Sequence, residues 1–281
     1  SWTIKEKKGN ILSSGSFNAK TYENGNGLFV GNLTFALNGI KSASKLTLEV
    51  KVNDTSFAND WNFWVYPEKN PEVPSSVYYT TVLDDKAKEV LNKGGKVFLN
   101  ASGKVIKGKE VAMHFLPVFW NTSWFKMKPP HVTGMLIQNE SPAFENFPTS
   151  FHSDMQWWDI QNRSQVMNLE DFPADFRPLI QPIDTWFMNR RLALVYEAKV
   201  GNGKIMVSSA DLGGSVDKPA SKALFYSLEK YMNSDKFDPK NILSFELIED
   251  VFATPSKETF NTYTKDSPDE LKPNSNQNRI K

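Results

Sequence analysis

The sequence predicts a protein of α/β plus all-β class, in which an N-terminal immunoglobulin-like β-sandwich precedes an α/β domain. Strand-like runs separated by turns fill residues 1 to about 68, and a strand–helix–strand pattern follows the prolines at positions 67, 71 and 74. The 281 residues are 40% hydrophobic and 13% aromatic, which provides enough apolar surface for a sizeable core. We therefore expect one domain over residues 1–70 and a second over residues 71–252.

The N-terminal region carries several strand signals. Lys45–Val52 alternates polar and apolar residues, as a half-buried strand does, and Leu28–Phe35 and Asn62–Pro67 are β-rich runs of strand length. Gly/Asn clusters at residues 9–10 and 24–27 supply the positive φ angles that hairpin turns need. Four or five short strands with such turns are typical of an immunoglobulin-like sandwich.

A strand–helix–strand unit opens the second domain. Val77–Leu83 is β-rich, and Asp84 and Asp85 are suited to cap a helix over residues 86–92. Lys96–Asn100 then reads as a strand. Two strands joined through a helix run parallel, which predicts an α/β domain with both strands in one sheet.

Further elements are expected downstream. Strands are predicted at Val111–Leu116, Leu192–Lys199 and Lys204–Ser209, and the last two flank the turn Gly201-Asn202-Gly203 as a hairpin. An amphipathic helix is predicted over Ala220–Asn233, because three apolar residues of this segment share one face: Leu224, Leu228 and Tyr231.

The two ends of the chain carry expectations of their own. The chain starts at Ser1 without an initiator Met and enters a strand pattern at once, which resembles a processed protein or an excised piece of a longer one. Residues 253–281 are polar and contain three prolines. We expect them to form an extended tail packed on the body.

Composition argues against several classes of function. A formal charge of +1 without a basic stripe argues against nucleic-acid binding. No apolar run approaches the roughly 20 residues that cross a bilayer, so no membrane span is expected. The chain has no cysteine and only three histidines, at positions 114, 131 and 152, with no metal-ligand spacing. We therefore expect no metal site and no cofactor.

Tryptophans concentrate between Phe119 and Arg191. Five of the eight lie there, at positions 120, 124, 157, 158 and 186, among planar polar side chains. Aromatic faces can cover the C–H face of a sugar while carboxylate, amide and guanidinium groups bind its hydroxyls. The predicted carbohydrate-binding residues are His152, Asp154, Gln156, Trp157, Trp158, Asp184, Arg190 and Arg191. The alternative is that these tryptophans fill the core.

The environments of the Trp157 and Trp158 side chains distinguish these two interpretations. In an extended segment, adjacent side chains point to opposite faces. We therefore expect one indole to be buried, and the other to line a surface cleft with His152, Gln156 and an arginine at position 190 or 191.

Catalytic patterns are weak. His152-Ser153-Asp154 cannot form a triad from adjacent residues, and the G-x-S-x-G elbow of α/β hydrolases is absent. Asp154, Asp159 and Asp184 remain candidates for an acid/base pair of the kind that glycoside hydrolysis uses, but that chemistry depends on a carboxyl separation that sequence does not give. We assign no catalytic residue.

Several segments resemble a known family. The segment Phe144–Asp159, which contains His-Ser-x-x-Gln-Trp-Trp-Asp, is the most specific, and residues 59–67, 177–184, 189–192, 201–207 and 231–234 support it. Over roughly residues 28 to 237, the chain resembles the region beyond the catalytic barrel in large, β-galactosidase-like glycoside hydrolase family 2 proteins of gut bacteria.

The resemblance implies a non-catalytic accessory region with a Rossmann-like, glutamine-amidotransferase-like α/β domain that lacks the catalytic Cys of that fold. Family 2 catalysis uses a (β/α)₈ barrel of about 250 residues, which has no place in this chain. The implied partners are the parent barrel, an oligosaccharide or polysaccharide and a further copy of the chain, in the periplasm or outside the cell. A stand-alone hydrolase or esterase and a purely structural module remain the alternatives.

Overall fold

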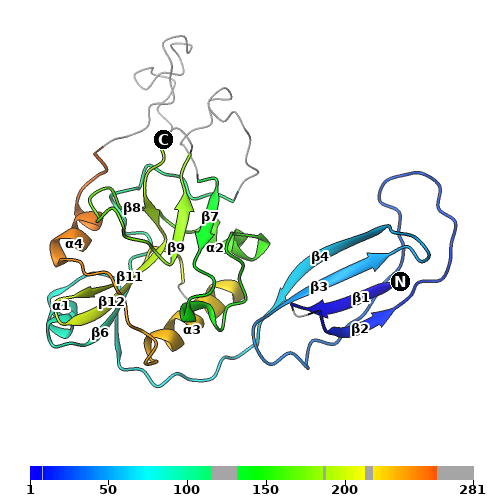
Figure 1. Cartoon of the computed structure of the whole chain (residues 1–281), viewed down its shortest axis with the longest axis horizontal. Coiled ribbons are helices and arrows are strands. Elements are labelled where there is room, and N and C mark those ends of the chain that lie inside the picture. Colours follow the sequence, from blue (N-terminus) through cyan, green and yellow to red (C-terminus); the bar gives the residue numbers. More distant parts are fainter. Residues whose placement is uncertain (8, 116–131, 186–187, 213–217, 258–281) are drawn as a thin grey trace, which may run out of the picture.

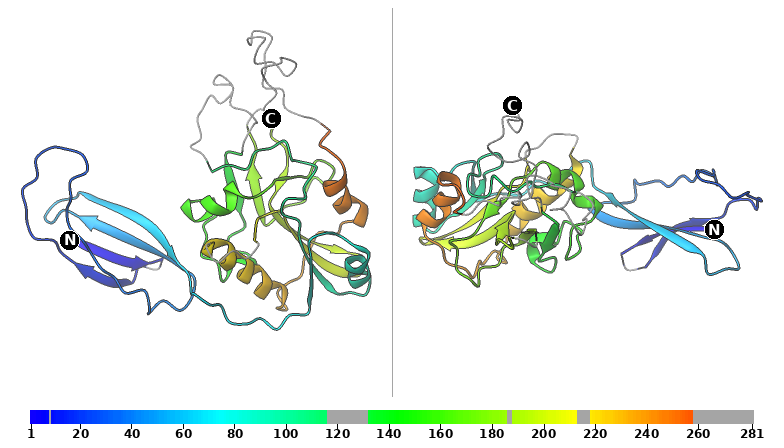
Figure 2. Two further views of the ribbon diagram at one scale, coloured as in Figure 1. Left: turned by 180° about the vertical axis from the view of Figure 1, so that it is seen from behind. Right: turned by 90° about the horizontal axis from the view of Figure 1, so that it is seen from above.

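A computed structural model describes residues 1–7, 9–115, 132–185, 188–212 and 218–257. An antiparallel sheet at the N-terminus projects from a larger α/β body, and one extended segment joins them (Figures 1 and 2). The predicted combination of an all-β region with a mixed α/β domain is therefore confirmed.

The N-terminal region forms one four-stranded antiparallel sheet in the order β2-β1-β3-β4. The strands are β1 (Trp2–Glu6), β2 (Ile11–Gly15), β3 (Ser44–Lys51) and β4 (Ala58–Val65). β3 and β4 correspond to two of the predicted strands. The predicted strand at Leu28–Phe35 is wrong, because this run has no strand conformation and Leu28, Phe29 and Val30 are exposed. β-propensity alone does not make a strand that has no partner to pair with.

The two faces of this sheet differ in polarity. The register places Leu46 opposite Phe63 and Leu48 opposite Trp61, so these four side chains share an apolar face. Lys45 and every second residue after it along β3 point to the other face. That polar face meets the α/β body, and together they line a cavity of about 260 Å³ whose residues include Lys5, Lys45, Thr47, Pro148, Thr149 and Ser150.

The α/β body is built on a six-stranded mixed sheet in the order β5-β6-β12-β11-β9-β7. Its strands are β5 (Val77–Thr80), β6 (Lys96–Asn100), β7 (Gly134–Ile137), β9 (Ile180–Ile183), β11 (Val195–Val200) and β12 (Gly203–Ser208). The β5–β6 and β6–β12 pairs are parallel, and the remaining pairs are antiparallel. Two short strands, β8 (Met167–Asn168) and β10 (Leu192–Ala193), pair separately.

The predicted strand–helix–strand unit is present. Helix α1 (Asp85–Asn92) joins the parallel strands β5 and β6, and the Asp84 side chain accepts a hydrogen bond from the Ala87 amide at 2.8 Å. The β11–β12 hairpin is confirmed as well, and its turn places Gly201 at φ 58°, where a side chain would be strained.

The strand predicted at Val111–Leu116 is wrong in its described part. Residues 111–115 have no ladder, although the Ala112 carbonyl accepts one hydrogen bond from the Val132 amide. Val111 and Met113 are buried in the core. The apolar pattern of this run therefore reflects burial rather than strand pairing.

Helices cover both faces of the central sheet. Helix α3 (Pro219–Met232) buries Leu224 and Leu228 in the core of one face, as predicted. Helix α1 and helix α4 (Phe245–Ala253) cover the other face (Figure 1). Successive strand residues alternate between the cores, so that Val97 belongs to one and Phe98 to the other.

The described start of the predicted C-terminal tail contacts the body. The Asn168 side-chain amide donates to the Ser256 hydroxyl at 3.1 Å, and the Lys257 amide donates to the Glu170 carboxylate at 2.9 Å. The rest of the tail lies outside the described residues. Within the described ranges, no helix combines the length and apolarity that crossing a membrane requires.

Candidate functional site

The predicted binding segment lies beside the junction of the two regions. Its residues form a short 3₁₀ helix, η2 (Met155–Trp157), which continues into α2 (Trp158–Asn162). The Asp154 side chain caps η2 by accepting a hydrogen bond from the Gln156 amide at 3.2 Å. Trp120, Trp124, His131 and Trp186 lie outside the described residues.

Two of the predicted binding residues contact the N-terminal region. Lys45 on β3 forms an ion pair with Asp154, with Nζ and Oδ2 3.3 Å apart. The Gln156 side-chain amide donates to the Tyr66 hydroxyl at 3.0 Å, just after β4. Asp154 and Gln156 therefore connect the two regions of the molecule.

Trp157 and Trp158 have opposite environments. Trp157 is fully buried, its Nε1 donates to the Thr149 hydroxyl at 3.0 Å, and its ring meets Phe147 edge-on at 5.1 Å. Trp158 is 51% exposed. The prediction that one indole is buried and its neighbour exposed is confirmed. The predicted surface cleft that Trp158 would share with Gln156 and an arginine is wrong, because Gln156 is buried and the segment is helical rather than extended.

Three large apolar side chains of segment 151–158 are exposed, and this set, Phe151, Met155 and Trp158, is here called the Trp158 surface. Phe151 is 61% exposed and Met155 is 63% exposed. Met155 and Trp158 are three residues apart along consecutive helical turns, so they face the same side. The ring of the exposed His152 meets the Phe151 ring at 4.7 Å.

Asp184 and Arg190 form a buried ion pair elsewhere in the body. Arg190 Nε lies 2.8 Å from Asp184 Oδ2, and Arg190 Nη1 lies 3.0 Å from Glu110 Oε1. Arg191 instead donates to the backbone carbonyls of Glu170, Phe172 and Pro173. Among the described residues, neither guanidinium is hydrogen-bonded to His152 or Gln156, because each already neutralises a carboxylate or satisfies carbonyl groups.

The aspartates considered for acid/base chemistry are all ion-paired. Asp154 pairs with Lys45, Asp159 with Arg163, and Asp184 with Arg190. No cluster of three or more His, Cys, Asp or Glu side chains suited to a metal ion occurs in the described part of the chain.

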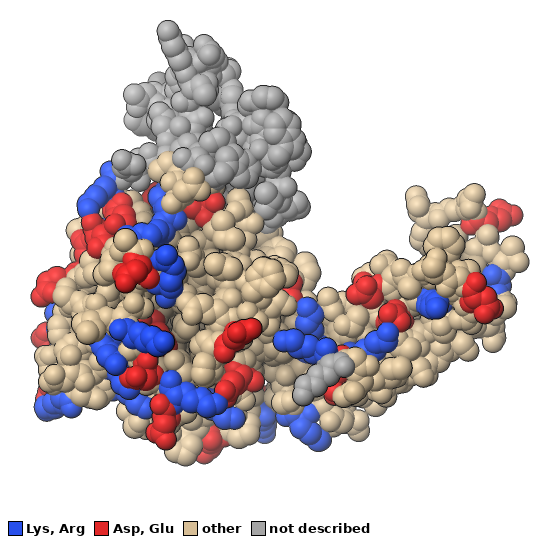
Figure 3. All heavy atoms as spheres, viewed as in Figure 1, with Lys and Arg blue, Asp and Glu red and all other residues tan. Residues whose placement is uncertain are grey.

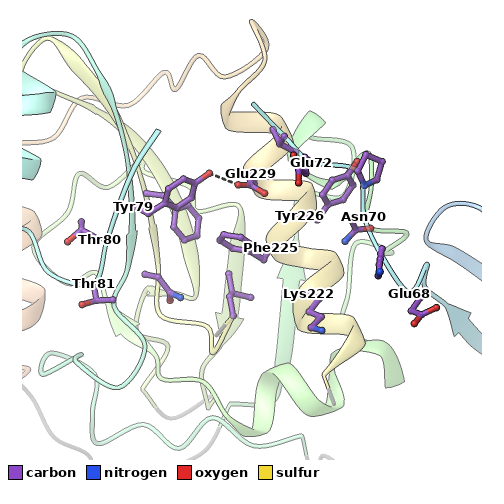
Figure 4. A pocket seen from close by; sticks show the side chains of 16 residues that line it. Glu68, Asn70, Glu72, Tyr79, Thr80, Thr81, Lys222, Phe225, Tyr226 and Glu229 are labelled. Atoms are coloured by element: carbon purple, nitrogen blue, oxygen red, sulfur yellow. Dashed lines mark hydrogen bonds between the residues drawn. The ribbon is translucent and has the colours of Figure 1, made fainter. Parts of the chain in front are cut away.

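Sequence reasoning missed a cleft of about 950 Å³ in the α/β body (Figure 4). The cleft lies at the carboxyl ends of β5 and β6, beside α3, and residues 68–73 of the linker form a further wall. Four aromatic side chains line it: Tyr79, Phe98, Phe225 and Tyr226. Ligands of open α/β sheets bind beyond the carboxyl ends of the strands, which is where this cleft opens.

Hydrogen bonds and ring contacts connect side chains in and beside the cleft. The Tyr79 hydroxyl donates to Glu229 Oε1 at 2.9 Å and accepts from the Ser75 hydroxyl at 3.2 Å. The Phe98 and Phe225 rings meet edge-on, with centroids 5.6 Å apart. Burial raises the pKa of Tyr79 to about 12; the hydrogen bond with Ser75 lowers it and the hydrogen bond to Glu229 raises it, each by less than burial does.

The lining residues explain why the cleft was missed. They come from the linker, β5, β6 and α3, which are distant in sequence and share no motif. The adjacent aromatics Phe225 and Tyr226 on an otherwise amphipathic helix were the one local signal.

Two family models match the chain. Residues 78–253 match a domain of unknown function, DUF8487, and residues 1–67 match a second domain of unknown function, DUF8488. The chain therefore belongs to the DUF8487 family, with a DUF8488 domain before it. A search of curated proteins finds no match.

Proposed function

We propose that the chain is a non-catalytic accessory region of a β-galactosidase-like glycoside hydrolase of family 2, and that it docks on the catalytic barrel or its carbohydrate. The observation that carries the proposal is the Trp158 surface, which exposes Phe151, Met155 and Trp158 in the same segment as the junction contacts of Asp154 and Gln156. The proposed link to glycoside hydrolase family 2 rests on the resemblance of segment 144–159 to the post-barrel region of those proteins.

An exposed tryptophan beside a buried one favours docking over a purely structural role. Trp157 fills the core and has its N–H satisfied, whereas Trp158 remains half exposed. A cluster of exposed apolar side chains is costly in solution and marks contact surfaces. Tryptophan is also enriched among the residues that dominate binding energy.

The ion pairs formed by the candidate carboxylates argue against catalysis by this chain. Asp154, Asp159 and Asp184 each have a cationic partner, so these groups serve structure. A stand-alone hydrolase or esterase using Asp154, Asp184 and His152 would have to break these ion pairs. The isolated chain should not hydrolyse aryl β-galactosides, β-glucuronides or β-mannosides.

The finer fold assignments belong to the same proposal. The N-terminal sheet is one half of an immunoglobulin-like sandwich, and its apolar face, which includes Leu46 and Trp61, is the inner face. The body is a Rossmann-like, amidotransferase-like domain whose β5–β6–β12 portion keeps the parallel arrangement. Assembly with a further copy, and a periplasmic or secreted location, follow from the resemblance alone.

The first test is the complete reading frame that encodes Ser1. A family 2 barrel of about 250 residues should lie upstream in the same frame. A frame without a barrel would rule the proposal out.

The second test is docking in trans. The upstream barrel is expressed separately, and its affinity for the chain is measured by biolayer interferometry. Trp158→Ala should weaken docking by about tenfold or more, as removal of a tryptophan hot spot does. Ile242→Ala is the control, because Ile242 is an exposed apolar residue of the body that belongs neither to the Trp158 surface nor to the N-terminal sheet. Equal affinities for both variants and the unmodified chain would exclude the Trp158 surface from docking.

A further inference from the structure

We infer that the cleft between α3 and linker residues 68–73 is a binding site for a neutral oligosaccharide. The geometry of the cleft indicates a binding site, and the choice of a sugar as ligand class rests also on the proposed function. The cleft shares no lining residue with the Trp158 surface, so the two sites can be tested separately.

Aromatic faces are the first feature that fits a sugar. Tyr79 from β5 and Phe225 from α3 lie on one side of the cleft, with ring centroids 6.0 Å apart (Figure 4). Tyr226 projects from α3 toward the linker, near Asn70 (Figure 4). A pyranose ring presents apolar C–H faces that can stack on such rings.

Hydrogen-bonding groups accompany the rings. Glu229 accepts from Tyr79 through Oε1, and Lys222 lies on the same helix, further along the cleft (Figure 4). Asn100 ends β6 in the cleft wall, and its buried Oδ1 has no hydrogen-bond partner among the described residues. Such a buried acceptor is costly, and a rotation of the Asn100 side chain that brought it to a sugar hydroxyl would offset that cost.

The charge of the lining disfavours phosphates. Three carboxylates line the cleft, from Glu68, Glu72 and Glu229, against two lysines, Lys69 and Lys222. A net charge of about −1 repels a polyanion such as a nucleotide, which basic groups or a glycine-rich loop would otherwise hold. A neutral ligand meets no such repulsion.

The size of the cleft favours more than one sugar ring. Its volume of about 950 Å³ is at the upper end of the roughly 300–1,000 Å³ of small-molecule sites. The linker wall is tethered near both ends, by Tyr66 to Gln156 and by the Ser76 amide to Asn233 Oδ1 at 3.0 Å. A wall held in place reduces the entropy lost on binding.

The test uses the full chain and four neutral probes, the β-1,4-linked trisaccharides of galactose, glucose, mannose and xylose. Binding is measured by isothermal titration calorimetry, with adenosine triphosphate and inorganic phosphate as anionic comparisons. At least one trisaccharide should bind, and the two anions should not. Binding of either anion in the cleft, or no binding of any trisaccharide at millimolar concentration, would overturn the inference.

Variants then locate the bound sugar. Tyr226→Ala should weaken binding by about tenfold, since it removes a stacking face at a half-buried position. Tyr79→Phe should weaken it less, because it removes the hydroxyl and keeps the ring. Tyr78→Phe is the matched control, since the adjacent Tyr78 packs against the other core. Thermal denaturation checks that each variant is folded.

The two proposals fail in different ways. If Trp158→Ala abolishes sugar binding and Tyr226→Ala leaves it unchanged, the cleft is excluded while the proposed function stands. If Tyr226→Ala weakens sugar binding and the reading frame contains no barrel, the cleft stands and the accessory role fails.

Discussion

The α/β body and the N-terminal sheet bury their apolar residues to very different extents. In the body, helices cover both faces, and strand residues such as Val97 and Phe98 alternate between two buried cores. In the N-terminal sheet, Leu46 is fully buried, but Trp61 on the same face is 51% exposed. When helices cover both faces of a sheet, the buried apolar side chains stabilise its strands. When one face stays partly exposed, fewer apolar contacts contribute to the stability of the strands.

Truncation of one tryptophan in each region tests whether the two regions differ in this way. Trp157→Ala should destabilise the body by about 3–5 kcal/mol, because it removes a fully buried aromatic side chain and leaves a cavity. Trp61→Ala should change the free energy of unfolding by less than about 1 kcal/mol, because Trp61 is half exposed. Urea denaturation followed by circular dichroism measures both. Similar losses would mean that the sheet is covered as fully as the body.

The same difference explains which elements the sequence predicted. The parallel β5–β6 unit, the β11–β12 hairpin and α3 were found because their periodicity, caps and turns agree with burial on a covered sheet. The runs Leu28–Phe35 and Val111–Leu116 have equally strong propensity but no ladder in their described parts. Pairing is a long-range property that local composition does not encode.

In the candidate site too, local features were predictable from the sequence and long-range contacts were not. The opposite environments of Trp157 and Trp158 were predicted correctly from an incorrect premise, because the segment is helical and not extended; adjacent side chains of a helix also point in different directions. The partners of Asp154 and Gln156 lie 109 and 90 residues away, so their role at the junction could not be read from the segment. The cleft beside α3 was missed for the same reason.

A second prediction tests the buried ion pair of the body. Asp184→Asn should destabilise the protein by about 3 kcal/mol, because it leaves the Arg190 guanidinium buried with less negative charge beside it. Asp175→Asn is the matched control, since Asp175 is exposed. Urea denaturation of both variants gives the difference. An Asp184→Asn loss no larger than that of the control would show that Glu110 alone neutralises Arg190.

A third prediction concerns the junction between the two regions. Tyr66→Phe removes the acceptor of the Gln156 side-chain amide and should cost about 1 kcal/mol, as loss of one hydrogen bond does. It should also separate the melting of the N-terminal sheet from that of the body in differential scanning calorimetry. Tyr78→Phe, whose hydroxyl lies 3.5 Å from Asp84, is the control. An unchanged melting profile would show that the regions are coupled by other contacts.

The smallest expected effect lies within the body, at Glu197 on β11. Its Oε1 accepts from the Tyr231 hydroxyl at 3.2 Å, its buried Oε2 has no partner among the described residues, and Lys204 and Asp238 are the nearby charges. Burial, with a smaller contribution from Asp238, raises the pKa of Glu197 above its usual range. The folded state therefore binds the proton more tightly than the unfolded state, and this contribution to stability is full at low pH and is lost as pH rises through the raised pKa.

Glu197→Gln should accordingly be more stable than the unmodified protein at about pH 7, by less than about 1 kcal/mol, and the advantage should disappear at about pH 4. Urea denaturation at both pH values measures it, and Glu140→Gln, at an exposed carboxylate, is the control. An advantage that grows toward low pH would contradict the assignment, because it would mean that the folded state favours the ionised carboxylate.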